Sequence, residues 1–304
     1  MAQPDVTRML VSVEGALARI TFAAGTTNII DRVMIGEMKA LIEWLRDEET
    51  ISVVLFESAV AGFFLNHLDL QNIPETRPEA PARPGRLRPL QVLVEDLRTL
   101  PQATIAVVEG RAVGFGCEFL AGCDMVFALT GGAVFAQIEV ALGVIPGAYG
   151  TQGLPRLMGR RRALEMILGC QEIDAVTAER YGLVNRSLEG AALRPFVETL
   201  ARRIASFPAR TIGLAKIAVE GAQLPIQVGL VHEAQTVETV FVGREAPRRV
   251  AKLRSLGAGE IEFERNGLFA ALASLGEHQI ELASADNGMP TTETRKDGVL
   301  SRRP

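Results

Sequence analysis

The chain has 304 residues, 48% hydrophobic and 22% charged, so it is long enough and apolar enough to bury a sizeable core. Its formal net charge of -4 excludes the general basic surface that binds nucleic acid. Three cysteines without a CxxC pair and three well-separated histidines exclude a disulfide framework and argue against a metal centre.

The N-terminal residues show no basic segment followed by a long apolar run, so we expect no signal peptide. No stretch approaches the ~18 unbroken apolar residues of a membrane span, and we expect no membrane association. An odd number of cysteines leaves one unpaired, which favours a reducing compartment. These observations together predict a cytoplasmic protein.

The first elements are predicted to be a β-hairpin and an amphipathic helix. Residues 9–26 alternate apolar and polar positions on both sides of a turn at Glu14 and Gly15. Asp31 can cap a helix over residues 32–49, whose apolar residues recur at helical spacing. A second helix is predicted over residues 87–100, and short apolar runs predict buried strands over residues 51–58, 104–110 and 123–130. Strands that alternate with helices indicate an α/β fold.

The remainder divides into a loop, a helical region and a tail. Residues 73–87 concentrate proline and arginine, which predicts an exposed loop. After Gly150 the pattern becomes helical, over residues 161–168, 174–184, 192–207, 209–222 and 226–243. We therefore expect an α/β core over residues 1–220, a helical region over 221–283 that caps the core or pairs with another subunit, and a disordered tail over 284–304.

A glycine-rich turn and two carboxylates in apolar surroundings suggest where the chemistry lies. The stretch "EGRAVGFGCEFLAGCD" passes from a strand through Gly114 and Gly116 into a helix that carries Glu118. The first turn of a helix leaves backbone N–H groups unpaired, and these can stabilise an oxyanion. The stretch has neither GK[ST] nor G-x-G-x-x-G, which argues against a nucleotide phosphate.

Glu139, between Ile138 and Val140, is the second such carboxylate. A pair of this kind suits proton transfer at the carbon next to a thioester carbonyl. The residues alone leave open the ordinary alternative, in which each glutamate is solvated or paired with an arginine.

The chain resembles the crotonase superfamily, the enoyl-CoA hydratase/isomerase group, in three blocks that stand in family order: "IAVVEGRAVGFGCEFLAGCDMVFA", "FAQIEVALGVIPGAYGTQGLPRLMG" and "AERYGLVNRSL". The resemblance covers roughly residues 8 to 220. It implies an α/β fold in which repeated ββα units form a spiral of stacked sheets, with C-terminal helices that pack in trimers, often paired as hexamers. It also implies an acyl-CoA thioester substrate and no separate cofactor, since coenzyme A is part of the substrate.

The resemblance assigns roles to individual residues. Glu118 matches the glutamate that helps to activate water, and Glu139 matches the one that handles the α-carbon proton. The backbone N–H groups of Leu68 and Phe115 match the oxyanion hole. Residues that the resemblance places at the substrate are Leu65, His67, Asp69, Leu70, Gly114, Gly116 and Ile138.

Several positions depart from the family pattern. Phe115, His67, Ile138 and Tyr149 are bulkier than the usual residues and are expected to add bulk near the acyl site. If position 67 requires a positive φ, histidine suits it less well than glycine. His67 is expected to shape the loop, with an acid or base role as the alternative.

Other polar residues have simpler interpretations. Cys117 is expected to be a small buried side chain, Asp69 a cap for the turn that follows it, and Asp124 a structural residue at a strand start. Lys216 and the arginines within residues 244–254 are candidates for binding the CoA phosphates on charge alone.

The leading hypothesis is hydration of a 2-enoyl-CoA to a 3-hydroxyacyl-CoA. An isomerase, a decarboxylase or another CoA-thioester enzyme of the same fold is the alternative, because fold does not settle the reaction. A CoA-binding assembly protein with weak catalysis is a third possibility, which the bulky residues near the site motivate.

Overall fold

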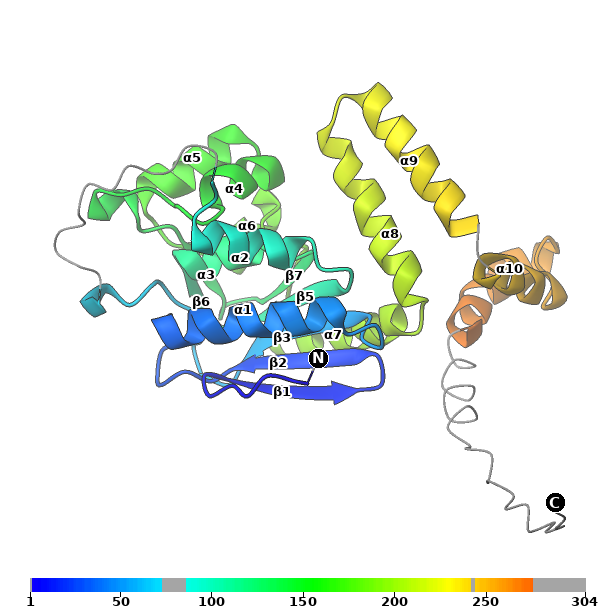
Figure 1. The fold of residues 1–304 in the computed structure, drawn as a ribbon, viewed down its shortest axis with the longest axis horizontal. Helices are drawn as coiled ribbons and strands as arrows, with labels where there is room; N and C mark the ends of the chain where they lie inside the picture. The colour runs from blue at the N-terminus through cyan, green and yellow to red at the C-terminus, as the bar shows by residue number, and fades with distance from the viewer. Residues whose placement is uncertain (1, 73–85, 242–243, 276–304) are drawn as a thin grey trace, which may run out of the picture. The chain divides into compact units, whose positions relative to one another are not determined.

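The computed structural model describes residues 2–72, 86–241 and 244–275, which Figure 1 draws as a ribbon. The chain divides into two compact units, Met1–Ala251 and Lys252–Pro304. The predicted boundary at residue 220 falls between two helical elements of the first unit and stays a prediction. The predicted tail at 284–304 and most of the predicted loop at 73–87 lie outside the described residues.

The larger sheet of the first unit contains the predicted hairpin and the predicted buried strands. In spatial order its strands are β1 (Met9–Glu14), β2 (Leu17–Phe22), β3 (Val53–Ser58), β5 (Ala103–Val108), β7 (Met125–Leu129) and β10 (Arg186–Leu188). β1 and β2 are antiparallel, with Gly15 at a φ of +58° in the turn between them. Every other neighbouring pair in this sheet is parallel.

A smaller sheet runs through β4 (Phe63–Leu65), β6 (Arg111–Val113), β8 (Val134–Ala136) and β9 (Ile173–Asp174). β3 and β4 precede helix α2 (Pro89–Arg98), and β5 and β6 precede helix α3 (Phe115–Gly122). In each repeat, as in the pair β7 and β8, the first strand joins the larger sheet and the second joins the smaller one. This confirms the predicted spiral of ββα units.

The central strands are covered on both faces, as their unbroken apolar sequences predicted. In β3, Val53 and Leu55 face a cluster that includes Leu193 and Val197 of helix α7 (Gly190–Ala205). Val54 and Phe56 alternate with them and face the main core. Side chains of a strand point alternately to its two faces, so only an uninterrupted apolar run can serve both layers.

Helix α1 (Arg32–Asp47) begins where the sequence predicted. Asp31 Oδ1 accepts a hydrogen bond of 2.8 Å from the Met34 N–H, which confirms its role as the N-cap. The remaining helices are α4 (Gly150–Met158), α5 (Arg160–Gly169), α6 (Ala175–Tyr181), α8 (Ala209–Glu220), α9 (Ile226–Phe241) and α10 (Glu245–Ser255). Short helical turns are η1 (Leu70–Asn72), η2 (Val140–Leu142), η3 (Gly221–Gln223) and, in the second unit, the π-helical η4 (Phe263–Gly267).

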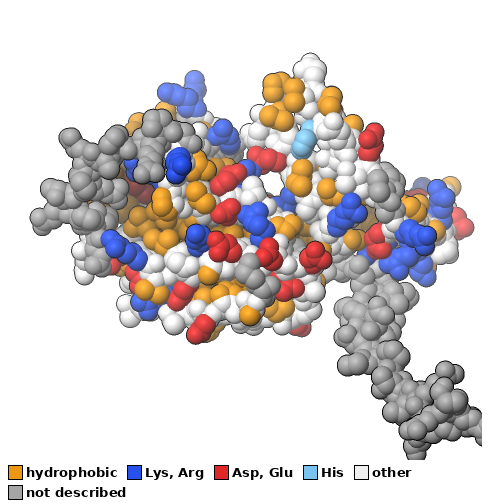
Figure 2. Space-filling model, viewed as in Figure 1, with side chains coloured by type: hydrophobic (Ala, Val, Ile, Leu, Met, Phe, Trp, Pro, Cys, Tyr) orange, Lys and Arg blue, Asp and Glu red, His pale blue; other side chains and the backbone are white. Residues whose placement is uncertain are grey.

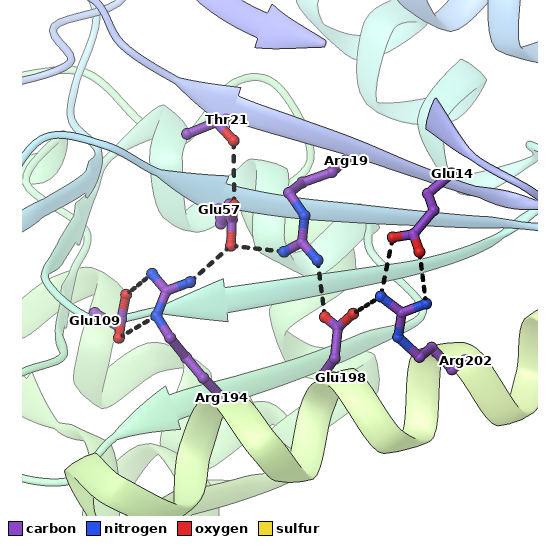
Figure 3. A network of polar contacts seen from close by, with 8 residues as sticks. All are labelled: Glu14, Arg19, Thr21, Glu57, Glu109, Arg194, Glu198 and Arg202. Atoms are coloured by element: carbon purple, nitrogen blue, oxygen red, sulfur yellow. Dashed lines mark hydrogen bonds and ion pairs between the residues drawn. The ribbon is translucent and has the colours of Figure 1, made fainter. Parts of the chain in front are cut away.

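A chain of ion pairs joins α7 to the larger sheet (Figure 3). At its centre is Glu57 of β3, which is 7% exposed and binds Arg19 at 3.1 Å and Arg194 at 3.0 Å. Arg19 also reaches Glu198 of α7 at 2.8 Å. The network continues through Thr21, Glu109, Arg202 and Glu14. Charges that lie beneath a helix are tolerated here because each has a partner of opposite sign.

Acidic and basic side chains are interspersed over the face that carries α1 and α2 (Figure 2), in keeping with a formal net charge of only -4. Within the described residues, no helix combines the length and the apolar character needed to cross a bilayer.

Candidate active site

The predicted turn between β6 and α3 has a backbone conformation that glycine alone adopts readily. Gly114 has φ +56° and ψ -120°. A Cβ atom on Gly114 would lie 3.0 Å from Glu139 Oε1 and 3.3 Å from His67 Cβ. The turn, the second glutamate and the loop after β4, which are far apart in the sequence, therefore meet at one point.

Gly116 brings the start of α3 directly against the end of β4. A Cβ atom on it would lie 2.0 Å from the carbonyl oxygen of Leu65, closer than any side chain could approach. Asn28 is fully buried at the centre of the neighbouring loop and donates from Nδ2 to Phe64 O at 2.8 Å. Its main-chain carbonyl oxygen accepts a hydrogen bond from the Asn66 N–H. Sequence analysis missed Asn28, although its positive φ of 49° explains the choice of asparagine.

The two backbone amides predicted for the oxyanion hole are both available as donors. Leu68 forms a parallel β-bridge with Ile30. The Ile30 N–H donates to His67 O and Ile30 O accepts from the Asp69 N–H, so the Leu68 N–H points away from Ile30. Phe115 is the first residue of α3, where an N–H has no partner within the helix. In the described part of the chain, neither amide donates to a protein group.

Glu118 lies in α3, and its contacts with the protein are made through one of its two carboxylate oxygens. The residue is 3% exposed, and its Oε1 accepts hydrogen bonds from the N–H groups of Ala148, Tyr149 and Gly150 at 2.9, 2.9 and 2.7 Å. Three donors on one oxygen stabilise negative charge there. No hydrogen bond from the described residues reaches Oε2, which leaves that oxygen for a water or a substrate.

Glu139 follows β8 and is only half-buried. Burial raises the pKa of its carboxyl to about 7, and the charge of Glu118 adds to that rise, while backbone hydrogen bonds at residues 138 and 139 oppose it. A carboxyl group with a pKa near neutrality can both accept and donate a proton under ordinary conditions. The two glutamates thus lie in different environments, as a division of acid and base roles requires.

Gln137 is a polar neighbour that sequence analysis missed. It is fully buried at the end of β8, and with its amide nitrogen toward Glu139 it donates to Oε2 at 2.7 Å and to Oε1 at 3.1 Å. Its only signal in the sequence is a polar residue within an apolar run, two positions before the predicted glutamate.

The other loop residues take local roles. His67 has no positive φ, since among the described non-glycine residues only Asn28 and Cys170 do. Its Nδ1 lies 2.8 Å from Leu68 O, which can only accept, so Nδ1 carries the proton. Asp69 Oδ1 accepts the Gln71 N–H at the start of η1, which confirms the predicted cap.

Two of the bulky residues near the turn, Phe115 and Tyr149, pack against other parts of the protein. Phe115 is 2% exposed and belongs to the main core. The Tyr149 ring lies against Gly153 of its own helix, 2.3 Å from where a Cβ atom would be. Of the remaining predicted substrate residues, Leu65 is buried, Ile138 is half-buried and Leu70 is exposed.

Cys117 and Asp124 have the structural roles expected of them. Cys117 is fully buried, and burial, followed by the charges of Glu118 and Glu139, raises the pKa of its thiol, which excludes a ready thiolate. Asp124 accepts hydrogen bonds from Thr104 and pairs with Lys216 at 2.7 Å. Lys216 also donates to Gln102 O, and its role at the CoA phosphates stays a prediction.

A cavity of about 770 Å³ lies away from the two glutamates, between the end of α2 and helices α8 and α9. Its lining includes Leu100, Ile212, Ile217 and Leu224. We place the reactive site at the turn instead, because that is where the glutamates and the free amides meet.

A profile of the family described as enoyl-CoA hydratase/isomerase matches residues 12–247, most of the chain. The chain belongs to this family. The crotonase-like fold and the resemblance seen in the sequence are thereby confirmed, and the function falls in the CoA-thioester hydratase/isomerase group of enzymes.

Relatives in this family support the assignment at modest identity. The chain is 32% identical over 222 residues to the human mitochondrial enoyl-CoA hydratase domain-containing protein 2, covering 70% of this chain and 75% of that protein. It is 29% identical over 239 residues to the short-chain-enoyl-CoA hydratase of Clostridium acetobutylicum, covering 78% and 90%. The crystal structure of an enoyl-CoA hydratase from Bacillus anthracis superposes with a TM-score of 0.74 at 27% identity, covering 82% of this chain and 96% of that one.

Proposed function

We propose that this protein hydrates a 2-enoyl-CoA to a 3-hydroxyacyl-CoA. The observation that carries the proposal is the pair Glu118 and Glu139, held in unlike environments near the Leu68 and Phe115 N–H groups, which donate to no protein group among the described residues. Hydration across a conjugated double bond needs three things: a site for the developing oxyanion, a group that positions water, and a group that delivers a proton.

The thioester carbonyl would lie between the N–H groups of Leu68 and Phe115. Negative charge develops on this oxygen as water adds to the β-carbon. Donors that are already oriented toward it can lower the barrier by about 3 kcal/mol each, on the scale measured for such holes. The side chains at these positions are unimportant for this role, since the donors belong to the backbone.

The two carboxyl groups would then divide the proton transfers. Glu118 accepts a hydrogen bond from the attacking water at Oε2, and the water oxygen bonds to the β-carbon. Protonated Glu139 delivers its proton to the α-carbon, and Glu118 takes the proton that the water loses. Transfer of that proton from Glu118 to Glu139, directly or through solvent, returns both carboxyl groups to their starting states. The net change is the addition of one water molecule.

The test is the loss of the conjugated thioester's absorbance, followed with purified protein and crotonyl-CoA, then with a longer and an aromatic enoyl-CoA. We expect Glu118→Gln and Glu139→Gln each to lower turnover by about 10²- to 10⁴-fold, the usual contribution of a general acid or base. Glu49→Gln, which removes one charge from an exposed position after α1, is the matched control. Full activity in both active-site variants, or saturable binding without turnover of any substrate, would refute hydration and favour an isomerase, a decarboxylase or an assembly protein.

We also propose that the chain forms a homotrimer or a dimer of trimers, and that it acts in the cytoplasm without a bound cofactor. Apolar side chains exposed on α8 and α9 support subunit contact there: Ile217, Val219, Ile226, Leu230 and Val231. Light scattering after gel filtration would give the mass of the assembly directly.

A further inference from the structure

We propose that Gln137 is a positioning residue that holds the carboxyl group of Glu139 and favours release of its proton. The inference rests on the proposed function, because it concerns the same proton. It goes beyond that function by assigning control of the proton to a buried neutral side chain from the end of β8.

Contacts at both ends fix the Gln137 side chain. With its amide nitrogen turned toward Glu139, Gln137 donates to Oε2 at 2.7 Å and to Oε1 at 3.1 Å, so both oxygens share one NH₂ group. When Glu139 is ionised, the reverse orientation would set the amide oxygen against the carboxylate, where two acceptors repel. On its other side, the Gln137 side chain lies next to the Cys117 thiol of α3. The residue is 0% exposed, so water cannot replace these partners.

The groups around Glu139 explain why such a contact is useful. Glu118 and Cys117 face it from α3, His67 lies beside it on the loop after β4, and Gln137 contacts it from beyond β8. Burial and the Glu118 charge both favour the protonated form of Glu139. Donation from a neutral amide favours the ionised form instead, without adding a charge to the site. Gln137 therefore keeps the proton transferable.

Gln137→Met tests this, because methionine fills a similar volume and cannot donate. Hydration requires protonated Glu139, so activity falls as pH rises through the pKa of that group. We expect the alkaline limb of the kcat profile to move up by about one pH unit in Gln137→Met, with KM for crotonyl-CoA changed less than about threefold. Gln152→Met, at an exposed position of α4, should leave the profile unchanged.

A second variant and a second measurement keep the test decisive. If Gln137→Met fails to fold, Gln137→Glu replaces the donor with a group of the same size, and the resulting carboxyl pair should hold a proton to still higher pH. A carbon-13 NMR titration of the glutamate carboxyls, with Glu139 assigned from Glu139→Gln, reports the same shift without any turnover. If the wild-type protein hydrates no enoyl-CoA, the proposed function alone is refuted. An unchanged Glu139 titration in folded Gln137 variants would refute this inference.

Discussion

Glu139→Gln should stabilise the folded protein above pH 7 and have little effect on stability near pH 4.5. The folded protein raises the pKa of this carboxyl from 4.5 to about 7, chiefly because the group is taken out of water. Below pH 4.5 the carboxyl is protonated in both folded and unfolded chains, so its stabilising contribution is fully present. As pH rises through 7 the folded protein must ionise a carboxyl that it holds more favourably as the acid, and that contribution is lost.

The size of the effect follows from the shift. A change from 4.5 to about 7 corresponds to about 3.4 kcal/mol at 1.36 kcal/mol per pKa unit. Glu139 is only half-buried and solvent screens part of its charge, so we expect about 1–2 kcal/mol of stabilisation by glutamine at pH 8.5.

Urea unfolding of the wild-type and Glu139→Gln proteins at pH 5 and pH 8.5 measures this difference directly. Glu49→Gln, at an exposed position, controls for the loss of one negative charge, and its effect should be small and similar at both pH values. Equal effects of Glu139→Gln at the two pH values, or destabilisation at pH 8.5, would show that ionisation of Glu139 is not disfavoured in the folded protein.

Two further substitutions test the close packing of α3 against β4 and the ion pairs between α7 and the larger sheet. Gly116→Ala should lower the free energy of unfolding by about 3 kcal/mol or more, because its Cβ atom would overlap the backbone of β4. Gly36→Ala, at an open position of α1, should instead raise the free energy of unfolding by about 0.5–1 kcal/mol. Thermal unfolding compares the two variants. Glu57→Gln should lower stability by about 1–3 kcal/mol, because Arg19 and Arg194 lose the charge that they share, and an unchanged midpoint of urea unfolding would contradict this.

Much of the fold could be predicted because local patterns determine it. The alternation in residues 9–26, the Asp31 cap and the apolar runs of the central strands all gave the correct elements. The short strands β4, β8, β9 and β10 were missed, since two or three residues carry no periodicity.

The site was predictable in its residue types but not in its contacts. The apolar surroundings of Glu118 and Glu139 marked them as unusual, and the family resemblance gave each a role. The contacts of Glu118 with Ala148 to Gly150 join segments 30 to 32 residues apart, which no local pattern encodes. Gln137 was missed for a similar reason, because its importance lies in where its amide points.

The three amides that contact Glu118 have a further consequence for helix α4. They belong to the residues around the start of that helix, where N–H groups lack intrahelical acceptors, and Tyr149 at the N-cap position provides no side-chain acceptor. Glu118 thus caps α4 from a different helix, and its negative charge lies at the positive end of the α4 dipole. Replacing it with an apolar residue would leave a helix terminus uncapped as well as removing a carboxylate. A variant of this protein that loses Glu118 must therefore supply another acceptor for the N–H groups at the start of α4.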